Sequence, residues 1–415
     1  MKRRDVLRLG ATLPLAGLAR RGAAAGARVV VIGGGYGGAT AARHIALADP
    51  AIDVTLVEPA EAFVSCPLSN LVLAGSRTLA DLTRGYDGLR GHGIRVVRDS
   101  ATAIDAAKRT VRLARGAPLP YDRVVVSPGI DFMLEQVEGY AGLQEQERVL
   151  HAWKAGPQTA ALRRQLEAMR DGGVYLLSVP MLPYRCPPAP YERACLVASY
   201  FKRAKPRAKV LILDANQEIT SEAKHFQRAW QELYRGLIDY RPNASVVGVE
   251  PGAARTDFET VPGDVLNVVP PQRAGRIAAA AGLITHNDRW CDVDWRTLES
   301  TAVPGVHVLG DATLAASAMP KSAHMAHDQA RVCAAAIVAL LNDRAPEPAP
   351  RMTSTCYSFL SEREAVRLAS VHRYDAAQKT MVQVKGSVRL SEARSEKEAA
   401  EALRWAQRLW ADMLG

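Results

Sequence analysis

The amino-acid sequence predicts an α/β protein with two Rossmann-like domains, the second inserted in the first, and a small C-terminal α+β domain. Three observations predict this fold. A β-branched run, a group of glycines and a helical pattern follow one another over residues 28–45. Two more apolar runs, 174–179 and 209–213, have the length and composition of buried parallel strands. A fourth short strand is expected within 303–312, which returns the chain to the first sheet.

The composition is that of an ordinary globular protein. The chain has 415 residues, of which 48% are hydrophobic and 23% charged, which excludes a disordered, collagen-like or coiled-coil protein and leaves room for two or three domains. The formal net charge is +10, and about half of it comes from residues 1–25. The remaining charge is spread out without a run of Lys and Arg, so we do not expect nucleic acid as a partner.

Residues 1–25 are typical of an export signal. The pair Arg3-Arg4 is followed by an apolar stretch, 9–19, and by the small residues 23–25. This order predicts export by the twin-arginine route and a periplasmic protein, with a basic amphipathic terminus as the alternative. The longest later apolar run, 332–341, is too short to span a bilayer, so no integral membrane segment is expected in the mature protein.

The cysteines lack the short spacings of zinc and haem sites. Neither C-x-x-C nor C-x-x-C-H occurs, which argues against a zinc ribbon, a thioredoxin-like motif and a c-type haem attached to this chain. An exported protein permits disulfides among the six cysteines. Cys195, Cys291 and Cys333 lie in apolar patterns and are expected in the core.

The first strand leads into a predicted dinucleotide site. Gly33, Gly35 and Gly38 supply the G-x-G-x-x-G fingerprint between strand and helix. They permit a tight turn, close approach of a pyrophosphate and packing of the helix on the strand. The second strand, 53–57, ends in Glu58, 20 residues after Gly38, where a carboxylate binds ribose hydroxyls and disfavours the 2′-phosphate of NADP.

Two distant segments favour FAD as the bound dinucleotide. Residues 303–312 resemble the second flavin motif of the flavoproteins with two dinucleotide-binding domains. In that motif the aspartate, here Asp311 after Gly310, holds the ribityl chain of the flavin. Residues 121–129 resemble the middle motif of the same family. The three motifs in this order predict FAD as the cofactor.

The second domain lacks a glycine-rich loop for a nicotinamide nucleotide. The strand at 173–179 leads instead into a proline-rich loop, 180–190. Prolines lack the N–H donors that would hold a pyrophosphate, so we do not expect NADH or NADPH to be the electron partner. The C-x-x-x-x-C redox pair of conventional reductases is also missing after Cys66.

Four further segments resemble the flavoprotein subunit of flavocytochrome c sulfide dehydrogenase. They are residues 184–193, 270–275, 319–322 and 355–358, and the similarity runs in order through essentially the whole mature chain. The resemblance implies an enzyme that oxidises sulfide, as hydrosulfide, to zero-valent sulfur on a redox disulfide beside FAD. It also implies that the electrons pass to a separate c-type cytochrome subunit.

The resemblance assigns roles to individual residues. Cys186 and Cys356 would form the redox disulfide, against the alternative of a structural staple. Glu192 would handle the proton that hydrosulfide loses, against the alternative of a surface acid at a helix start. Cys66 would bond covalently to the 8-methyl carbon of the flavin, against the alternative of an unattached buried thiol.

Three other kinds of side chain invite a functional interpretation. Lys321 would place a cation beside the flavin pyrimidine, and Arg273 would act similarly or be structural. His324 and His327 share a helix face, but no third ligand accompanies them, so no metal site is predicted.

The domain boundaries expected from these motifs define four parts. They are an export signal at 1–25, an FAD-binding domain at 27–130 and 265–342, a second Rossmann-like domain without an NAD site at 131–264, and a C-terminal domain at 343–415. The last domain should end in an amphipathic helix, 396–414, with Leu403, Ala406, Trp410 and Met413 on one face.

Two other functions stay open at this point. One is a membrane-associated sulfide–quinone oxidoreductase, which would use the C-terminal helix to contact the membrane and would reduce quinones. The other is a non-catalytic, flavin-binding accessory protein of a sulfur-oxidising complex, whose flavin would not be bleached by sulfide.

Overall fold

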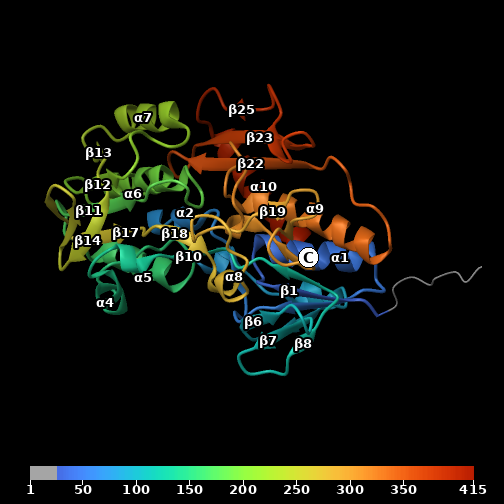
Figure 1. The fold of residues 1–415 in the computed structure, drawn as a ribbon. Helices are drawn as coiled ribbons and strands as arrows, with labels where there is room; N and C mark the ends of the chain where they lie inside the picture. The colour runs from blue at the N-terminus through green and yellow to red at the C-terminus, as the bar shows by residue number, and fades with distance from the viewer. Residues whose placement is uncertain (1–25) are drawn as a thin grey trace, which may run out of the picture.

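A seven-stranded sheet forms the centre of the first domain in the computed structural model, which describes residues 26–415 (Figure 1). Neighbouring strands are parallel from β21 through β9, β1 and β2 to β5. The β-branched side chains of β1 are buried, as a parallel strand covered on both faces requires. In sheet order the strands are β19 (Val293–Asp294), β20 (Glu299–Ser300), β21 (Val306–Val308), β9 (Arg123–Val126), β1 (Arg28–Ile32), β2 (Asp53–Val57) and β5 (Arg95–Val97).

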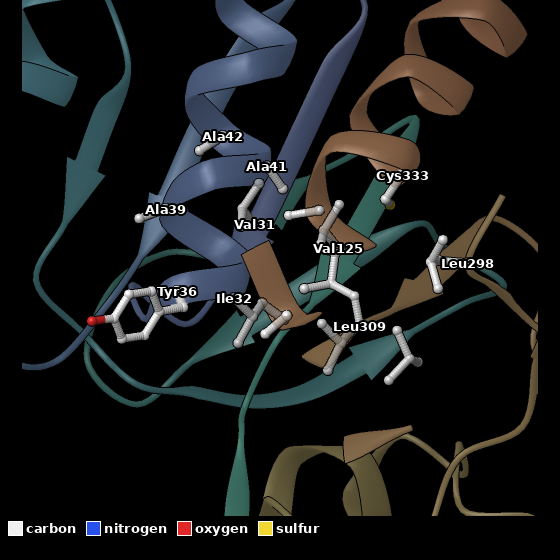
Figure 2. Close-up of a cluster of buried hydrophobic side chains, with 14 of the residues drawn as sticks. Val31, Ile32, Tyr36, Ala39, Ala41, Ala42, Val125, Leu298, Leu309 and Cys333 are labelled. Atoms are coloured by element: carbon white, nitrogen blue, oxygen red, sulfur yellow. The ribbon is translucent and has the colours of Figure 1, made fainter. Parts of the chain in front are cut away.

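Helices α1 (Tyr36–Ala48) and α9 (Ala323–Leu341) pack against each other on this sheet. Figure 2 shows the small residues of α1 beside Val31 of β1, with Val125 and Cys333 in the same cluster. Alanines at these positions let the helix approach the sheet closely. Cys195, Cys291 and Cys333 are fully buried, which confirms their predicted place in the core.

The second domain is built on a four-stranded parallel sheet with the order β13-β12-β11-β17. The two strands predicted here are present as β11 and β12. The predicted boundary between residues 264 and 265 is wrong, because β17 pairs with β11 and belongs to this sheet. The domain contains β11 (Val174–Val179), β12 (Lys209–Asp214), β13 (Ile238–Arg241), β17 (Val265–Val268), α4 (Tyr140–Glu145), α5 (Pro157–Ala168), α6 (Ala189–Ala204) and α7 (Ala223–Glu232).

The C-terminal region is an antiparallel sheet followed by one long helix. The sheet consists of β22 (Arg351–Phe359), β23 (Ala365–Asp375), β24 (Thr380–Gln383) and β25 (Arg389–Leu390). Helix α10 (Glu396–Leu414) spans the predicted residues and is capped by the side chain of Ser395. Ala406, Trp410 and Met413 are buried as expected, whereas Leu403 is only half-buried.

Short elements connect these units. β10 pairs with β18 where the chain passes between the two large domains. These elements are β3 (Phe63–Val64), β4 (Thr83–Arg84), β6 (Ala101–Asp105), β7 (Thr110–Leu113), β8 (Leu119–Pro120), β10 (Ile130–Phe132), β14 (Val246–Glu250), β15 (Ala253–Thr256), β16 (Thr260–Pro262), β18 (Gln272–Ala274), α2 (Ser69–Ala74), α3 (Asp87–Gly91) and α8 (Arg276–Ala280). Among residues 26–415, no helix has both the length and the apolar character needed to cross a membrane. The predicted export signal lies outside the described residues.

Candidate active site

A cavity of about 950 Å³ lies where the carboxyl ends of the first sheet meet the start of α6 and the middle of β22. This is the edge at which open α/β sheets bind their ligands. The volume is at the upper end of the range for cofactor pockets. Its wall includes residues from all three domains, so the C-terminal sheet and α10 complete a site that begins at β1.

The glycine-rich end of the cavity has the geometry of a dinucleotide site. Gly33 has φ +99°, and a Cβ atom there would collide with the carbonyl oxygen of Ser127. A Cβ on Gly35 would meet nothing within 4 Å, so its backbone is open to a ligand. Glu58 follows β2 at the same end, where it accepts hydrogen bonds from the backbone N–H groups of Gly34 at 2.7 Å and Ala60 at 2.8 Å.

Asp311 marks the other part of the cofactor site. It lines the cavity, and its Oδ1 atom is buried without a hydrogen-bond partner among residues 26–415. Burial raises the pKa of this carboxyl group, and the nearby Arg185 and Lys321 oppose the rise. A carboxylate that lines a cavity and has an oxygen without a hydrogen-bond partner suits a ligand hydroxyl group. The glycines, Glu58 and Asp311 therefore fit the pyrophosphate, ribose and ribityl groups of FAD.

Cys186 and Cys356, 170 positions apart in sequence, both line this cavity. Cys186 lies in the loop before α6 with φ +60°, and its N–H donates to the carbonyl oxygen of Lys321 at 2.8 Å. Burial raises the pKa of the Cys186 thiol well above its ordinary value, and Cys356 and Glu192 raise it further. The structure brings the two cysteines together as free thiols, so their disulfide stays a prediction.

Glu192 is a cavity residue in the first turn of α6, which excludes the alternative of a surface acid. Its carboxylate accepts hydrogen bonds from Nδ2 of Asn70 at 2.6 Å and from the N–H of Phe359 at 2.9 Å. Burial nevertheless raises its pKa to about 7, because the hydrogen bonds only partly offset the loss of solvation. A carboxyl group with this pKa can both accept and donate a proton near neutral pH.

Cys66 lies in the same wall, between β3 and α2. Its sulfur accepts hydrogen bonds from the N–H of Ala155 at 3.4 Å and from the guanidinium of Arg185 at 3.6 Å. The thiol also donates to the carbonyl oxygen of Trp153 at 3.8 Å. The location agrees with a cysteine that reaches the flavin, and the covalent bond stays a prediction.

The ammonium group of Lys321 contacts backbone carbonyl oxygens and an aromatic ring. Lys321 is absent from the cavity wall, and its ammonium group donates to the carbonyl oxygen of Asp311 at 2.9 Å and lies 3.7 Å from the centre of the Trp290 ring. Burial lowers its pKa to about 7. Lys321 therefore supports the backbone at Asp311 and Cys186, and its predicted place against the flavin pyrimidine stays a prediction.

The other secondary candidates have local partners. Arg273 pairs with Glu135 at 2.9 Å and does not line the cavity, which favours its structural alternative. His324 lines the cavity and accepts a hydrogen bond from the N–H of Thr355 at 2.8 Å, whereas His327 contacts Asp412 at 2.7 Å. Among residues 26–415, no cluster of three or more His, Cys, Asp or Glu side chains could hold a metal ion.

The site also contains residues to which the sequence analysis gave no role. Asn70 links two functional positions, because it donates to Glu192 and accepts from Nε of Arg193 at 2.9 Å. Arg185 contacts Cys66 and lies 3.9 Å from the carboxylate of Asp311. The sequence could have indicated Arg185, because it directly precedes Cys186. Nothing in the sequence indicated Asn70, because its partner Glu192 is 122 residues away.

In the second domain, the acid at the position that would bind the ribose of a second nucleotide is hydrogen-bonded within the protein. Asp214 ends β12 as Glu58 follows β2 in the first domain, but Asp214 is fully buried. Its Oδ2 atom accepts hydrogen bonds from the hydroxyl groups of Tyr191 at 2.7 Å and Tyr240 at 3.1 Å. The carboxylate of Asp214 thus already accepts hydrogen bonds from side chains of the protein.

The fold and this site together define an FAD-binding protein with two dinucleotide-binding-type domains. Sequence models of three families match the chain: "Pyridine nucleotide-disulphide oxidoreductase" at 27–167, "Sulfide dehydrogenase [flavocytochrome c] flavoprotein chain, central" at 159–270, and "Flavocytochrome c sulphide dehydrogenase, flavin-binding" at 348–414. The chain belongs to the family of flavocytochrome c sulfide dehydrogenase flavoprotein chains. This confirms the family, the FAD cofactor and the fold class predicted from the sequence.

Individual relatives agree with this membership. The sulfide dehydrogenase [flavocytochrome c] flavoprotein chain of Chlorobaculum thiosulfatiphilum is 62% identical over 45 residues, which cover 11% of this chain and 94% of that sequence. The mitochondrial sulfide:quinone oxidoreductase of Mus musculus is 26% identical over 306 residues, 69% of this chain and 65% of the mouse protein. The chain thus spans slightly less than two thirds of that relative.

Solved structures support the fold. The X-ray structure of the sulfide:quinone oxidoreductase from Aquifex aeolicus superimposes with a TM-score of 0.77 at 18% identity. The superposition covers 93% of this chain and 91% of the other.

Proposed function

We propose that this protein oxidises sulfide to zero-valent sulfur through a Cys186–Cys356 disulfide and passes the electrons to a c-type cytochrome. One observation carries the proposal. Two cysteines from distant segments and the protonatable Glu192 share the wall of the cavity that fits FAD. The names of the family and of its sulfide:quinone oxidoreductase relatives support sulfide as the substrate.

The first step is attack by hydrosulfide on the disulfide. A new S–S bond forms between hydrosulfide and one cysteine, the Cys186–Cys356 bond breaks, and the other cysteine leaves as a thiolate. The resulting persulfide retains the hydrogen of hydrosulfide. In the second step the S–S bond of the persulfide breaks, the outer sulfur leaves as zero-valent sulfur, and the two cysteines form their disulfide again with the loss of two electrons, while Glu192 takes the proton.

Bound FAD would supply the acceptor for these two electrons. Per sulfide, two electrons and one proton leave hydrosulfide, which balances the conversion to zero-valent sulfur. The residues of this chain hold the cofactor at Glu58 and Asp311, place the sulfur atoms and manage the proton.

An anaerobic titration with sulfide tests the proposal. The flavin absorbance of the purified holoprotein should bleach and return after addition of a small oxidised c-type cytochrome. Cys186→Ser and Cys356→Ser should abolish the bleaching while FAD stays bound, because neither cysteine belongs to the dinucleotide fingerprint. Cys333→Ser, a buried cysteine away from the cavity, is the matched control.

The outcomes separate this function from its rivals. Undiminished bleaching in Cys186→Ser or Cys356→Ser would defeat the disulfide mechanism. Reoxidation by a soluble quinone but not by the cytochrome would favour a sulfide–quinone oxidoreductase, the activity named for the mouse and Aquifex relatives. No bleaching in the unmodified protein would favour a non-catalytic accessory role.

The proposed location is the periplasm, reached by the twin-arginine route. Arg3-Arg4 and the apolar stretch after them support it. Arg3→Lys combined with Arg4→Lys should leave the protein in the cytoplasmic fraction of an expressing bacterium with this export route. Periplasmic recovery of the double variant would contradict the proposal.

A further inference from the structure

The guanidinium group of Arg193 is a buried cation that the chemistry proposed above does not use. Arg193 follows Glu192 on α6, lines the cofactor cavity and is only 3% exposed. All its hydrogen bonds in the described part of the chain go to uncharged oxygen atoms. Burial of a charge is costly unless the surroundings compensate it, so the place of Arg193 requires an explanation.

Four hydrogen bonds hold this guanidinium in one orientation. Nη1 donates to the carbonyl oxygen of His151 and to Oδ1 of Asn267, both at 2.9 Å. Nη2 donates to the carbonyl oxygen of Ala152 at 2.8 Å, and Nε donates to Oδ1 of Asn70 at 2.9 Å. The acceptors come from α2, from β17 and from the chain before α5, so three separate segments fix the position of the guanidinium.

The bond from Nε determines how the side-chain amide of Asn70 is oriented. A guanidinium group has only donors, so the amide atom that faces Arg193 must be the oxygen. The NH2 group of Asn70 then donates to Oε2 of Glu192 at 2.6 Å and to the carbonyl oxygen of Ala189 at 3.3 Å. The reverse orientation would bring two donors together at Arg193 and would turn the amide oxygen toward the carboxyl group of Glu192. Arg193 therefore makes Asn70 a donor to Glu192.

The orientation of Asn70 affects the charge of Glu192. Asn70 donates to one carboxyl oxygen and the N–H of Phe359 donates to the other, so both donors favour the carboxylate. Burial raises the pKa of Glu192, and these two hydrogen bonds and the charge of Arg193 oppose the rise. The other titratable groups that interact with Glu192 are Cys186 before α6, Cys195 on α6, Glu222 before α7 and Cys356 on β22.

We propose that Arg193 is the positioning residue of Glu192 and acts through the amide of Asn70, which it keeps with its NH2 group toward the carboxylate. The inference deepens the proposed function, in which Glu192 accepts the proton of the persulfide. Without the bond from Arg193, the Asn70 amide can turn its oxygen toward a protonated Glu192 and accept a hydrogen bond from it. This would favour the acid form, which cannot accept a proton. Arg193 itself exchanges no proton.

Arg193→Lys separates this role from that of a buried charge. Lysine retains the positive charge, but a methylene group replaces the Nε–H group that donates to Asn70. Infrared difference spectra of the oxidised holoprotein at varied pH follow the carbonyl band of protonated Glu192, identified as the band that Glu192→Gln removes. Arg193→Lys should raise the midpoint pH of this band by roughly half a unit. Arg203→Gln, which changes an exposed arginine of the same helix, is the matched control and should leave the midpoint unchanged.

A double variant tests whether Arg193 acts through Asn70. In the Asn70→Ala protein the amide is absent, so the addition of Arg193→Lys should cause no further rise of the midpoint. An equal rise with and without Asn70 would overturn the inference, and so would an unchanged midpoint in Arg193→Lys alone. FAD content and melting temperature, measured on every variant, show whether the protein is folded. If the lysine variant unfolds, Arg193→Gln provides the test and should raise the midpoint further, because it also removes the charge.

The infrared titration needs no sulfide. Failure of the proposed function would therefore appear separately, as a flavin that sulfide does not reduce in a protein whose Glu192 midpoint still depends on Arg193.

Discussion

Tyr191 donates its hydroxyl hydrogen bond to the carboxylate of Asp214 at 2.7 Å in the second domain. Asp214 ends the second strand of that domain, where a Rossmann-type nucleotide site places the acid that binds ribose. In the first domain the corresponding Glu58 lines the cofactor cavity. The second domain thus contains the strand and the acid, but the acid is bound by a tyrosine of α6, the helix that precedes the strand.

This contact predicts that nicotinamide nucleotides do not reduce the flavin. Under anaerobic conditions, NADH or NADPH in tenfold excess should leave the flavin absorbance unchanged, because Asp214 is occupied and the loop before α6 is rich in prolines. Dithionite should bleach the same sample and thereby show that the flavin is reducible. Rapid bleaching by either nucleotide would contradict this expectation.

The parts of the site whose residues are close together in the sequence could be predicted from the sequence. The run from β1 through Gly33 and Gly35 to α1 specifies its own turn, and Cys186 and Glu192 are separated by six positions at one helix start. The position of β17 was missed, because a short apolar strand fits either sheet equally well.

Side-chain direction and tertiary contacts could not be predicted from the sequence. Lys321 belongs to a segment that resembles the family, yet its ammonium group turns to Trp290 and to backbone carbonyls. Asn70 acquires its role from contacts with α6, far away in sequence.

Covalent attachment of the flavin to Cys66 is the second prediction. After acid precipitation of the holoprotein, the yellow colour should stay with the protein, and mass spectrometry should find the flavin on the peptide that contains Cys66. Cys66→Ser should release all flavin on precipitation and should still bind FAD reversibly through the glycine-rich end of the cavity. Cys291→Ser is the control. Complete release from the unmodified protein would show that Cys66 is an unattached thiol.

The third prediction concerns the hydrogen bond from Asn70 to Glu192. This bond lowers the pKa of Glu192, so its removal in Asn70→Ala should raise that pKa above about 7. Glu192 accepts a proton only in its carboxylate form. The acid limb of the pH profile for sulfide-driven flavin reduction should therefore move to higher pH in Asn70→Ala.

The ionisation of hydrosulfide affects every variant equally, so comparison between variants removes its contribution. Glu192→Gln should lose the part of the acid limb that belongs to the carboxyl group and should retain the part that belongs to hydrosulfide. Identical profiles in Asn70→Ala, Glu192→Gln and the parent would exclude Glu192 from proton transfer.

The raised pKa of Glu192 also predicts how stability depends on pH. Its pKa is about 7 in the folded protein and near 4.5 when unfolded, so the native state binds more protons between these values. The contribution of this group to stability is fully present below about pH 4.5 and is lost as pH rises through about 7. Glu192→Gln should flatten this slope, measured as melting temperature between pH 5 and 8. An unchanged slope would show that the pKa of Glu192 is not raised in the folded protein.

The last prediction concerns the attachment of α10 to the cofactor domain. The indole N–H of Trp410 donates to the hydroxyl oxygen of Tyr36 at 3.0 Å, and Tyr36 begins α1 directly after the glycine-rich turn. The Trp410 ring is buried with the guanidinium of Arg84 4.2 Å from its centre. Trp410→Ala should therefore lower the free energy of unfolding by about 3–5 kcal/mol. Trp410→Phe retains most of the packing and loses the hydrogen bond, so its loss should be about 1 kcal/mol. Arg408→Ala, on the exposed side of the same helix, should have little effect on stability.

Since Tyr36 and Trp405 also line the cavity, Trp410→Ala should weaken retention of FAD in a Cys66→Ser background, measured by ultrafiltration. Equal stability and equal FAD retention in Trp410→Ala and Arg408→Ala would show that α10 does not support the cofactor site.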